Sequence, residues 1–167
     1  MAGASASVQS CAMEIERSFL LAADPPASAL AVEHIDQGYL AIDDRGAEVR
    51  VRRRGADLTL TVKSLHRGAA RLEEELAIDE QRFERLWPLT LGRRLEKDRH
   101  LHALDGGLTA ELDVYAGSLA GLRVVEVEFA TQRDGDAFVP PPWFGAEITD
   151  DERYRNRALA VRGRPPA

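Results

Sequence analysis

The sequence predicts an α+β fold, mainly antiparallel β, built as an eight-stranded closed barrel with a charged interior and helices packed outside. About eight segments alternate between polar and apolar residues, as β-strands do, and only two segments have helical spacing. Charged residues recur on one face of seven of these strands. Short turns favour antiparallel pairing of neighbouring strands, and about eight antiparallel strands suggest a closed barrel or a strongly curved sheet.

Length and composition favour one globular domain. The chain has 167 residues, of which 44% are hydrophobic and 30% charged, and its formal net charge is −6. The negative charge argues against a nucleic-acid-coating protein, and no apolar run approaches the roughly 20 residues of a membrane helix. The single Cys11 excludes an intrachain disulfide. We expect a cytoplasmic monomer or homodimer with a disordered tail over 1–12, a domain over 13–161 and a C-terminal tail over 162–167.

Turn signals divide the first half of the chain into strands. Asp24-Pro25-Pro26 ends the first strand, and Asp43-Asp44-Arg45-Gly46 and Gly55-Ala56-Asp57 have the composition of hairpin turns. Alternating residues between these signals predict strands over 13–21, 34–42, 47–54, 58–65 and 70–78.

The period then changes from that of a strand to that of a helix. Asp79 is a suitable N-cap for a helix over 80–92, with Pro88 as a kink or early end. Further strands are expected over 94–103, 108–115 and 122–130, followed by a loop over 131–142. Asp150 would cap a final helix to about residue 161, which covers the barrel exterior or plugs one end of its interior.

The polar faces of the strands carry six cations and eight carboxylates. The cations are Arg50, Arg52, Lys63, Arg71, Lys97 and Arg99, and the carboxylates are Glu14, Glu16, Glu73, Glu75, Glu111, Asp113, Glu126 and Glu128. In a single strand such a face is usually the solvated side of a half-buried sheet, but seven in succession favour a shared interior. Converging arginines suit a polyanion such as phosphate, and clustered carboxylates suit Mg²⁺ or Mn²⁺. The combination suggests phosphoryl chemistry.

In this order the segments resemble the CYTH domains, also called triphosphate tunnel metalloenzymes. The resemblance rests on Glu14-Ile15-Glu16, Gln37-Gly38-Tyr39-Leu40, Val49 to Arg52, Leu60 to Lys63, Arg71-x-Glu73-x-Glu75, Lys97-x-Arg99, Glu111-x-Asp113-x-Tyr115, Glu126-x-Glu128 and Trp143 to Thr149. It implies an eight-stranded antiparallel tunnel that binds a triphosphate and a divalent metal. Members of the family hydrolyse inorganic triphosphate, thiamine triphosphate or RNA 5′ ends, or cyclise ATP.

The resemblance also implies a role for each site residue. The metal ligands would be Glu14, Glu16, Glu126 and Glu128. The phosphates would be bound by Arg50, Arg52, Lys63, Arg71, Lys97 and Arg99. Lys97, which would orient the attacking water, and Glu16 are the expected catalytic residues. The predicted function is metal-dependent hydrolysis of inorganic triphosphate or a related small triphosphate by in-line attack of water.

One position departs from the family pattern. The signature Glu-x-Glu-x-Lys has Ser18 at its last position, and a hydroxyl cannot supply the charge of a lysine. Arg17 lies on the opposite face by parity and does not replace it. Two alternatives therefore stay open: a module that binds polyphosphate or nucleotide without turnover, and an adenylate-cyclase-like enzyme. By the same parity, His100 and His102 would point away from Lys97 and Arg99.

Overall fold

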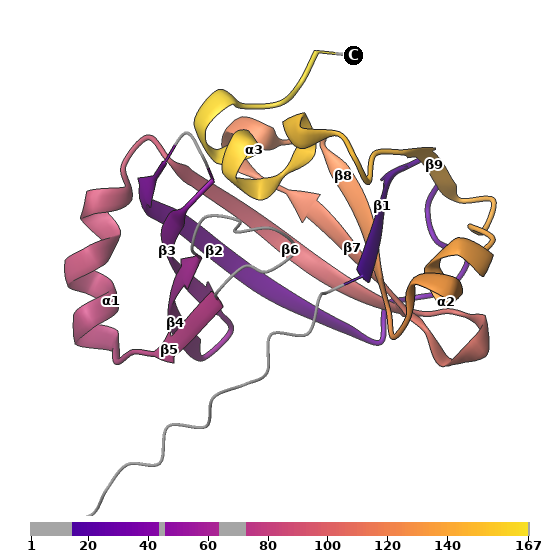
Figure 1. Cartoon of the computed structure of the whole chain (residues 1–167), viewed down its shortest axis with the longest axis horizontal. Coiled ribbons are helices and arrows are strands. Elements are labelled where there is room, and N and C mark those ends of the chain that lie inside the picture. Colours follow the sequence, from indigo (N-terminus) through magenta and orange to yellow (C-terminus); the bar gives the residue numbers. More distant parts are fainter. Residues whose placement is uncertain (1–14, 44–45, 64–72, 167) are drawn as a thin grey trace, which may run out of the picture.

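The computed structural model describes residues 15–43, 46–63 and 73–166. Its strands form one antiparallel sheet of nine, in the order β5-β4-β3-β2-β6-β7-β8-β1-β9 (Figure 1). The strands are β1 (Ile15–Leu21), β2 (Ala31–Ile42), β3 (Glu48–Arg54), β4 (Asp57–Lys63), β5 (Glu73–Ala77), β6 (Arg94–Ala103), β7 (Thr109–Tyr115), β8 (Arg123–Phe129) and β9 (Phe144–Glu147). This confirms the α+β, mainly antiparallel class.

Short helices connect these strands. The α-helices are α1 (Glu80–Leu86), α2 (Gln132–Ala137) and α3 (Asn156–Arg162), and the 3₁₀ turns are η1 (Trp87–Thr90), η2 (Asp105–Gly107), η3 (Gly117–Leu119) and η4 (Glu152–Tyr154). Among the described residues, the structure has no helix with the length and apolar character needed to cross a bilayer. The predicted tail over 1–12 lies outside the described residues.

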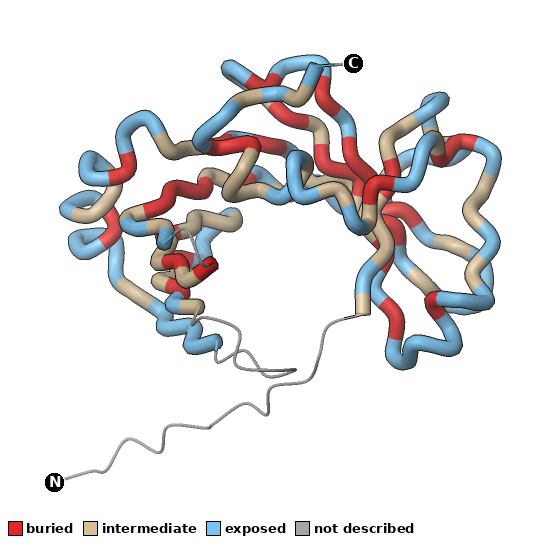
Figure 2. The backbone as a smooth tube through the Cα atoms, turned by 45° about the horizontal axis from the view of Figure 1, so that its top comes forward, coloured by how far each residue is buried: buried red, intermediate tan, exposed pale blue. Residues whose placement is uncertain are grey.

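The prediction of eight strands is wrong, and closure of the barrel is not observed among the described residues. The additional strand is β9, which pairs with β1 through Phe19↔Glu147 and Leu21↔Phe144, with an irregularity between them. Four residues are too few for alternation to show in a sequence, so β9 could not be recognised there. Figure 2 shows the sheet strongly curved, and its order leaves β5 and β9 as the two edge strands.

Helices cover the apolar face of the sheet, as predicted. Val51 of β3 and Leu58 of β4 pack with Phe83 of α1, whose ring stacks on Trp87 at 5.3 Å. A second apolar cluster lies on β1, β7 and β8 and includes Trp143. Residues 131–142 are not entirely loop, because Thr131 accepts a hydrogen bond from the Asp134 amide and caps α2.

The last helix differs from the prediction in shape and position. It is divided into η4, capped by Asp151 rather than Asp150, and α3, with an extended residue at Arg155 between them. Leu159 and Ala160 of α3 join a buried cluster with Tyr39 and Val124. Tyr39 and Val124 also line a pocket on the charged face of the sheet. The C-terminal segment therefore covers one end of that face, which favours the plug over an exterior cover.

Candidate active site

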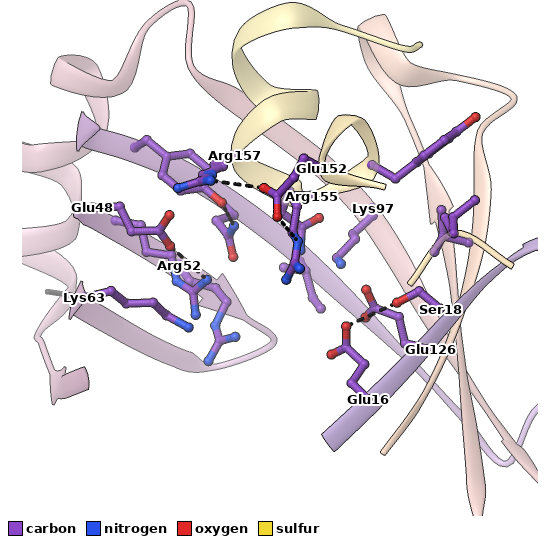
Figure 3. Close-up of a pocket in the computed structure, with 18 of the residues that line it drawn as sticks. Glu16, Ser18, Glu48, Arg52, Lys63, Lys97, Glu126, Glu152, Arg155 and Arg157 are labelled. Atoms are coloured by element: carbon purple, nitrogen blue, oxygen red, sulfur yellow. Dashed lines mark hydrogen bonds and ion pairs between the residues drawn. The ribbon is translucent and has the colours of Figure 1, made fainter. Parts of the chain in front are cut away.

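A pocket of about 530 Å³ lies on the charged face of the sheet (Figure 3). Strands β2, β3, β4 and β6 line one side of it, β1 and β8 line another, and Gly46 and the segment 148–157 contribute the rest. Its cationic lining residues are Arg50, Arg52, Arg54, Lys63, Lys97, Arg99, Arg155 and Arg157, and its acidic ones are Glu16, Glu48, Glu126, Asp151 and Glu152. Cations outnumber acids, so the pocket favours an anion although the chain as a whole is acidic.

A row of cations comes from β3 and β4. Antiparallel pairing sets Arg50 opposite Thr61 and Arg52 opposite Thr59, which places these side chains on one face. The Nε atom of Arg50 is buried and has no hydrogen-bond partner in the part of the chain that the structure describes. Burial, and then repulsion from Arg50, lowers the pKa of Arg52. An unsatisfied buried donor and crowded like charges are both relieved by an anion with several oxygens.

Two predicted tunnel acids on the neighbouring strand β5 pair with this row. Glu73 binds Lys63 with an Nζ–Oε2 distance of 2.7 Å. Glu75 accepts from Arg52 at 3.2 Å and from the Thr61 hydroxyl at 3.0 Å. These carboxylates orient the cations of β3 and β4 and do not line the pocket themselves.

A buried ion cluster holds Lys97 and Arg99 on β6. Asp113 is fully buried, and Lys97, which is only 3% exposed, donates to its Oδ2 atom. Arg99 makes two hydrogen bonds of 2.7 Å to Asp113 and also pairs with Glu111. Burial alone would raise the pKa of Asp113, but Lys97 and Arg99 hold it below its ordinary value. Lys97 is therefore fixed as a charged donor at the pocket wall.

Acidic side chains face this cluster from β1 and β8. The register sets Ser18 opposite Glu126 and Glu16 opposite Glu128, so all four share the face of the pocket. The Ser18 hydroxyl donates to Glu16 Oε1 at 3.2 Å, and Arg99 donates to Glu126 at 2.6 Å. Burial raises the pKa of Glu126 to about 7. A buried acid that ionises reluctantly gains from a nearby cation.

The oxygen atoms of this acidic group suit a hard divalent cation. Glu16 and Glu126 line the pocket, whereas Glu128 lies on the same face but outside the lining. Within residues 15–43, 46–63 and 73–166, no three His, Cys, Asp or Glu side chains are arranged as a ready metal site. The predicted ligand Glu14 and the predicted phosphate ligand Arg71 lie outside the described residues. The described chain thus supplies two carboxylates and a hydroxyl to such a site.

The structure adds lining residues that sequence reasoning missed. Arg155 and Arg157 come from the segment expected as a final helix, and Glu48 and Arg54 extend the face of β3. The signal for the arginines was their alternation just after Tyr154, but the sequence predicts one continuous helix there, in which alternating residues share no face.

Two residues of the Gln-Gly-Tyr-Leu segment also line the pocket. Gln37 donates from Nε2 to the Tyr39 hydroxyl at 2.8 Å, and burial raises the pKa of Tyr39 to about 12. The Tyr39 hydroxyl is therefore protonated at neutral pH and can donate a hydrogen bond.

The histidines that the structure describes take no part in the pocket lining. His34 pairs with Asp98 at 2.7 Å, and His102 lies 5.9 Å from the Trp143 ring in the apolar cluster. None of the three described histidines, His34, His100 and His102, lines the pocket, and His66 lies outside the described residues.

Comparison with known proteins extends over nearly the whole chain. No family model matches the sequence. An inorganic triphosphatase from Nitrosomonas europaea is 48% identical over 148 residues, which are 89% of this chain and 97% of that protein. Another, from Acetivibrio thermocellus, is 34% identical over 147 residues, which are 87% of this chain and 92% of that protein. The crystal structure of an inorganic triphosphatase matches with a TM-score of 0.74 and 44% identity, covering 93% of this chain and 98% of the other.

Proposed function

The chain belongs to the family of these inorganic triphosphatases, and from that membership we propose that it hydrolyses inorganic triphosphate or a related small triphosphate with a divalent metal. The observation that carries the proposal is the pocket itself. A row of cations on β3 and β4, with an unsatisfied donor on Arg50, faces the acids of β1 and β8 across one space. A triphosphate with its metal is the small ligand that meets both sides at once.

We assign binding of the triphosphate to two sets of cations. Arg50, Arg52 and Lys63 would bind phosphate oxygens from the β3–β4 side. Lys97 and Arg99 would bind from the β6 side, where Asp113 fixes their positions before the substrate arrives. Arg71 would add to this set by the family resemblance. Such preorganised charges stabilise the negative charge that develops during phosphoryl transfer.

The divalent cation, Mg²⁺ or Mn²⁺, would neutralise charge on the phosphate oxygens. Glu16 and Glu126 are the pocket-lining residues that would hold it, and by family resemblance Glu128, on the same face, and Glu14 complete the set. Lys97 is a charged donor, so its role is to orient the attacking water and not to remove its proton. The finer description of the fold as a CYTH domain with a closed tunnel is part of the same proposal.

The test is phosphate release from inorganic triphosphate, with Mg²⁺ or Mn²⁺, beside ATP and thiamine triphosphate. We expect metal-dependent release that Glu16→Gln removes. Glu74→Gln is the matched control, because Glu74 alternates with Glu73 and Glu75 on β5 and does not line the pocket. An equal loss of phosphate release in both variants would mean that any lost carboxylate lowers activity, wherever it lies, and would contradict a specific role for Glu16 in the pocket.

Ser18 supports a second candidate, a module that binds triphosphate without turnover. The β1 position that carries a lysine in the resembled family has only a hydroxyl here, already bonded to Glu16. Metal-dependent binding by calorimetry, with no phosphate released from any of the three substrates, would establish this second function. Pyrophosphate and a cyclic nucleotide formed from ATP would instead indicate a cyclase.

A further inference from the structure

Ser18 leaves the β1 side of the pocket without a cation of its own. Its hydroxyl donates to Glu16, and its neighbour across the strands is Glu126. Arg17 cannot turn to this side, because Glu147 holds it with bonds of 2.8 and 2.7 Å and the carbonyls of Gly135 and Phe138 hold it at 3.0 Å. Positive charge must reach this side of the pocket from another element.

The C-terminal segment begins directly beside Ser18. The Ile148 amide donates to the Ser18 carbonyl at 2.8 Å, and the Ser18 amide donates to Thr149 Oγ1 at 3.1 Å. Both backbone groups of Ser18 are therefore bonded to the start of the segment that lines the pocket over residues 148–157.

Arg155 lies at the joint of this segment, between η4 and α3. Its backbone is extended, with φ −60° and ψ 136°, and its carbonyl accepts from the Ala158 and Leu159 amides at 2.8 and 3.0 Å. The next residue, Asn156, accepts from the Tyr115 hydroxyl at 2.8 Å. The backbone is thus fixed, and Figure 3 shows the Arg155 side chain directed into the pocket between Arg52 and Lys97.

The Arg155 guanidinium is held only weakly in this position. Its partner is Glu152, with an Nε–Oε1 distance of 3.4 Å, and the side chains are 53% and 64% exposed. An exposed ion pair of this kind contributes little free energy, so Arg155 can exchange the carboxylate for a phosphate. Arg157 shares Glu152 at 3.1 Å, but its other nitrogen lies against Gly46, on the β2–β3 side and away from Ser18.

We propose that Arg155 supplies the substrate-binding cation that Ser18 does not, by binding a terminal phosphate of the triphosphate. The inference rests on the proposed function. A guanidinium gives two parallel hydrogen bonds to phosphate and stays charged at every relevant pH. Arg155 therefore binds substrate and stabilises charge but takes no proton. Glu152 holds the guanidinium until the substrate displaces it.

A double-mutant cycle between positions 18 and 155 tests the proposal. Arg155→Gln should lower kcat/KM for inorganic triphosphate with Mg²⁺ by about 10- to 100-fold, the range for one lost charged hydrogen-bond pair. In the Ser18→Lys background the same change should cost at least about threefold less, because the two cations then serve overlapping roles. Equal losses in both backgrounds would show that Arg155 does not stand in for the missing lysine.

Three controls make the outcome specific. Arg153→Gln removes a cation from the same segment that pairs with Asp151 and does not line the pocket, so it should leave kcat/KM unchanged. Arg155→Lys keeps the positive charge and should therefore restore most of the activity that Arg155→Gln loses. A purely structural arginine would not depend on its charge in this way. Unchanged thermal unfolding of Arg155→Gln excludes a folding defect.

Failure of this proposal is distinguishable from failure of the proposed function. If the wild type releases no phosphate, the same double-mutant cycle can be measured as binding affinity, by calorimetry of inorganic triphosphate with Mg²⁺. Arg155→Gln should then still weaken binding by a similar factor. A wild type that is active, with Arg155→Gln equally active, would overturn only the role of Arg155.

Discussion

At the scale of single residues, the titration of Glu126 depends strongly on its surroundings. Burial raises its pKa to about 7, although Lys97 and Arg99 oppose the shift. The folded pKa lies above the ordinary carboxyl value of about 4.5, so the protonated form stabilises the metal-free protein at low pH. That contribution is lost as pH rises from about 4.5 through 7. A divalent metal ion bound to Glu126 would reverse this preference, because it binds the ionised carboxylate.

This shift predicts a pH-dependent affinity for Mg²⁺. Binding requires the carboxylate, so the affinity should rise by up to about tenfold per pH unit below pH 7 and level off above it. Calorimetric titration at pH 6, 7 and 8 measures this slope, and the proton released appears as a buffer-dependent heat. Glu126→Gln should bind weakly with little pH dependence. An affinity that is constant from pH 6 to 8 would contradict the assignment of Glu126 to the metal.

The placement of site residues was largely predictable from strand parity. Seven of the predicted residues line the pocket: Glu16, Arg50, Arg52, Lys63, Lys97, Arg99 and Glu126. Parity assigns a face but does not say which acid meets which cation. Asp113 was expected among the tunnel acids, yet it is fully buried beneath Lys97 and Arg99. Only the cross-strand register Lys97↔Tyr115 and Arg99↔Asp113 explains this arrangement.

At the scale of elements, β2 and η1 approach each other closely at Gly38. A Cβ atom there would lie 2.5 Å from Thr90 Oγ1 and 2.7 Å from its Cβ. Thr90 cannot easily move, because it is fully buried, donates to the Trp87 carbonyl at 2.7 Å and accepts from Arg94 at 2.8 Å. The glycine is required by this contact and not by a positive φ.

Gly38→Ala should therefore destabilise the protein by about 1–3 kcal/mol, the usual cost of overpacking a rigid site. Urea unfolding measures the change. Gly135→Ala is the matched control, because its added Cβ would meet the nearest atom at an ordinary 3.4 Å. The control should be neutral or slightly stabilising. Equal stability of the two variants would mean that η1 shifts to admit the methyl group.

The elements that sequence reasoning found and missed differ in length and regularity. Strand β6 has its predicted bounds, because ten residues show alternation clearly. Helix α2 has six residues, less than two turns, and strand β9 has four, only two alternations. The prediction of one continuous C-terminal helix was wrong for another reason. Helical spacing in the sequence does not reveal the extended residue Arg155, whose side chain lines the pocket.

At the scale of the whole molecule, the pocket joins parts of the sheet that are far apart in strand order. The cations of β3 and β4 and the acids of β1 and β8 are separated by β2, β6 and β7. Without ligand, burial disfavours the charged form on each side and neighbouring like charges add to this, as the lowered pKa of Arg52 and the raised pKa of Glu126 show. A triphosphate with its metal would neutralise both sides together.

Triphosphate and Mg²⁺ should therefore stabilise the fold more together than the sum of their separate effects. At 100 times the dissociation constant, we expect a rise in Tm of about 5–10 °C for a chain of this size. A triphosphate analogue with methylene bridges prevents hydrolysis during the scan. Arg52→Gln should lose most of this rise, whereas Arg53→Gln should keep it, because Arg53 pairs with Glu80 and Glu84 of α1 outside the pocket. Equal rises in Tm in the two variants would show that the ligand does not bind to the cations of β3. A rise in Tm that does not depend on Mg²⁺ would show that the acids of β1 and β8 do not take part in binding.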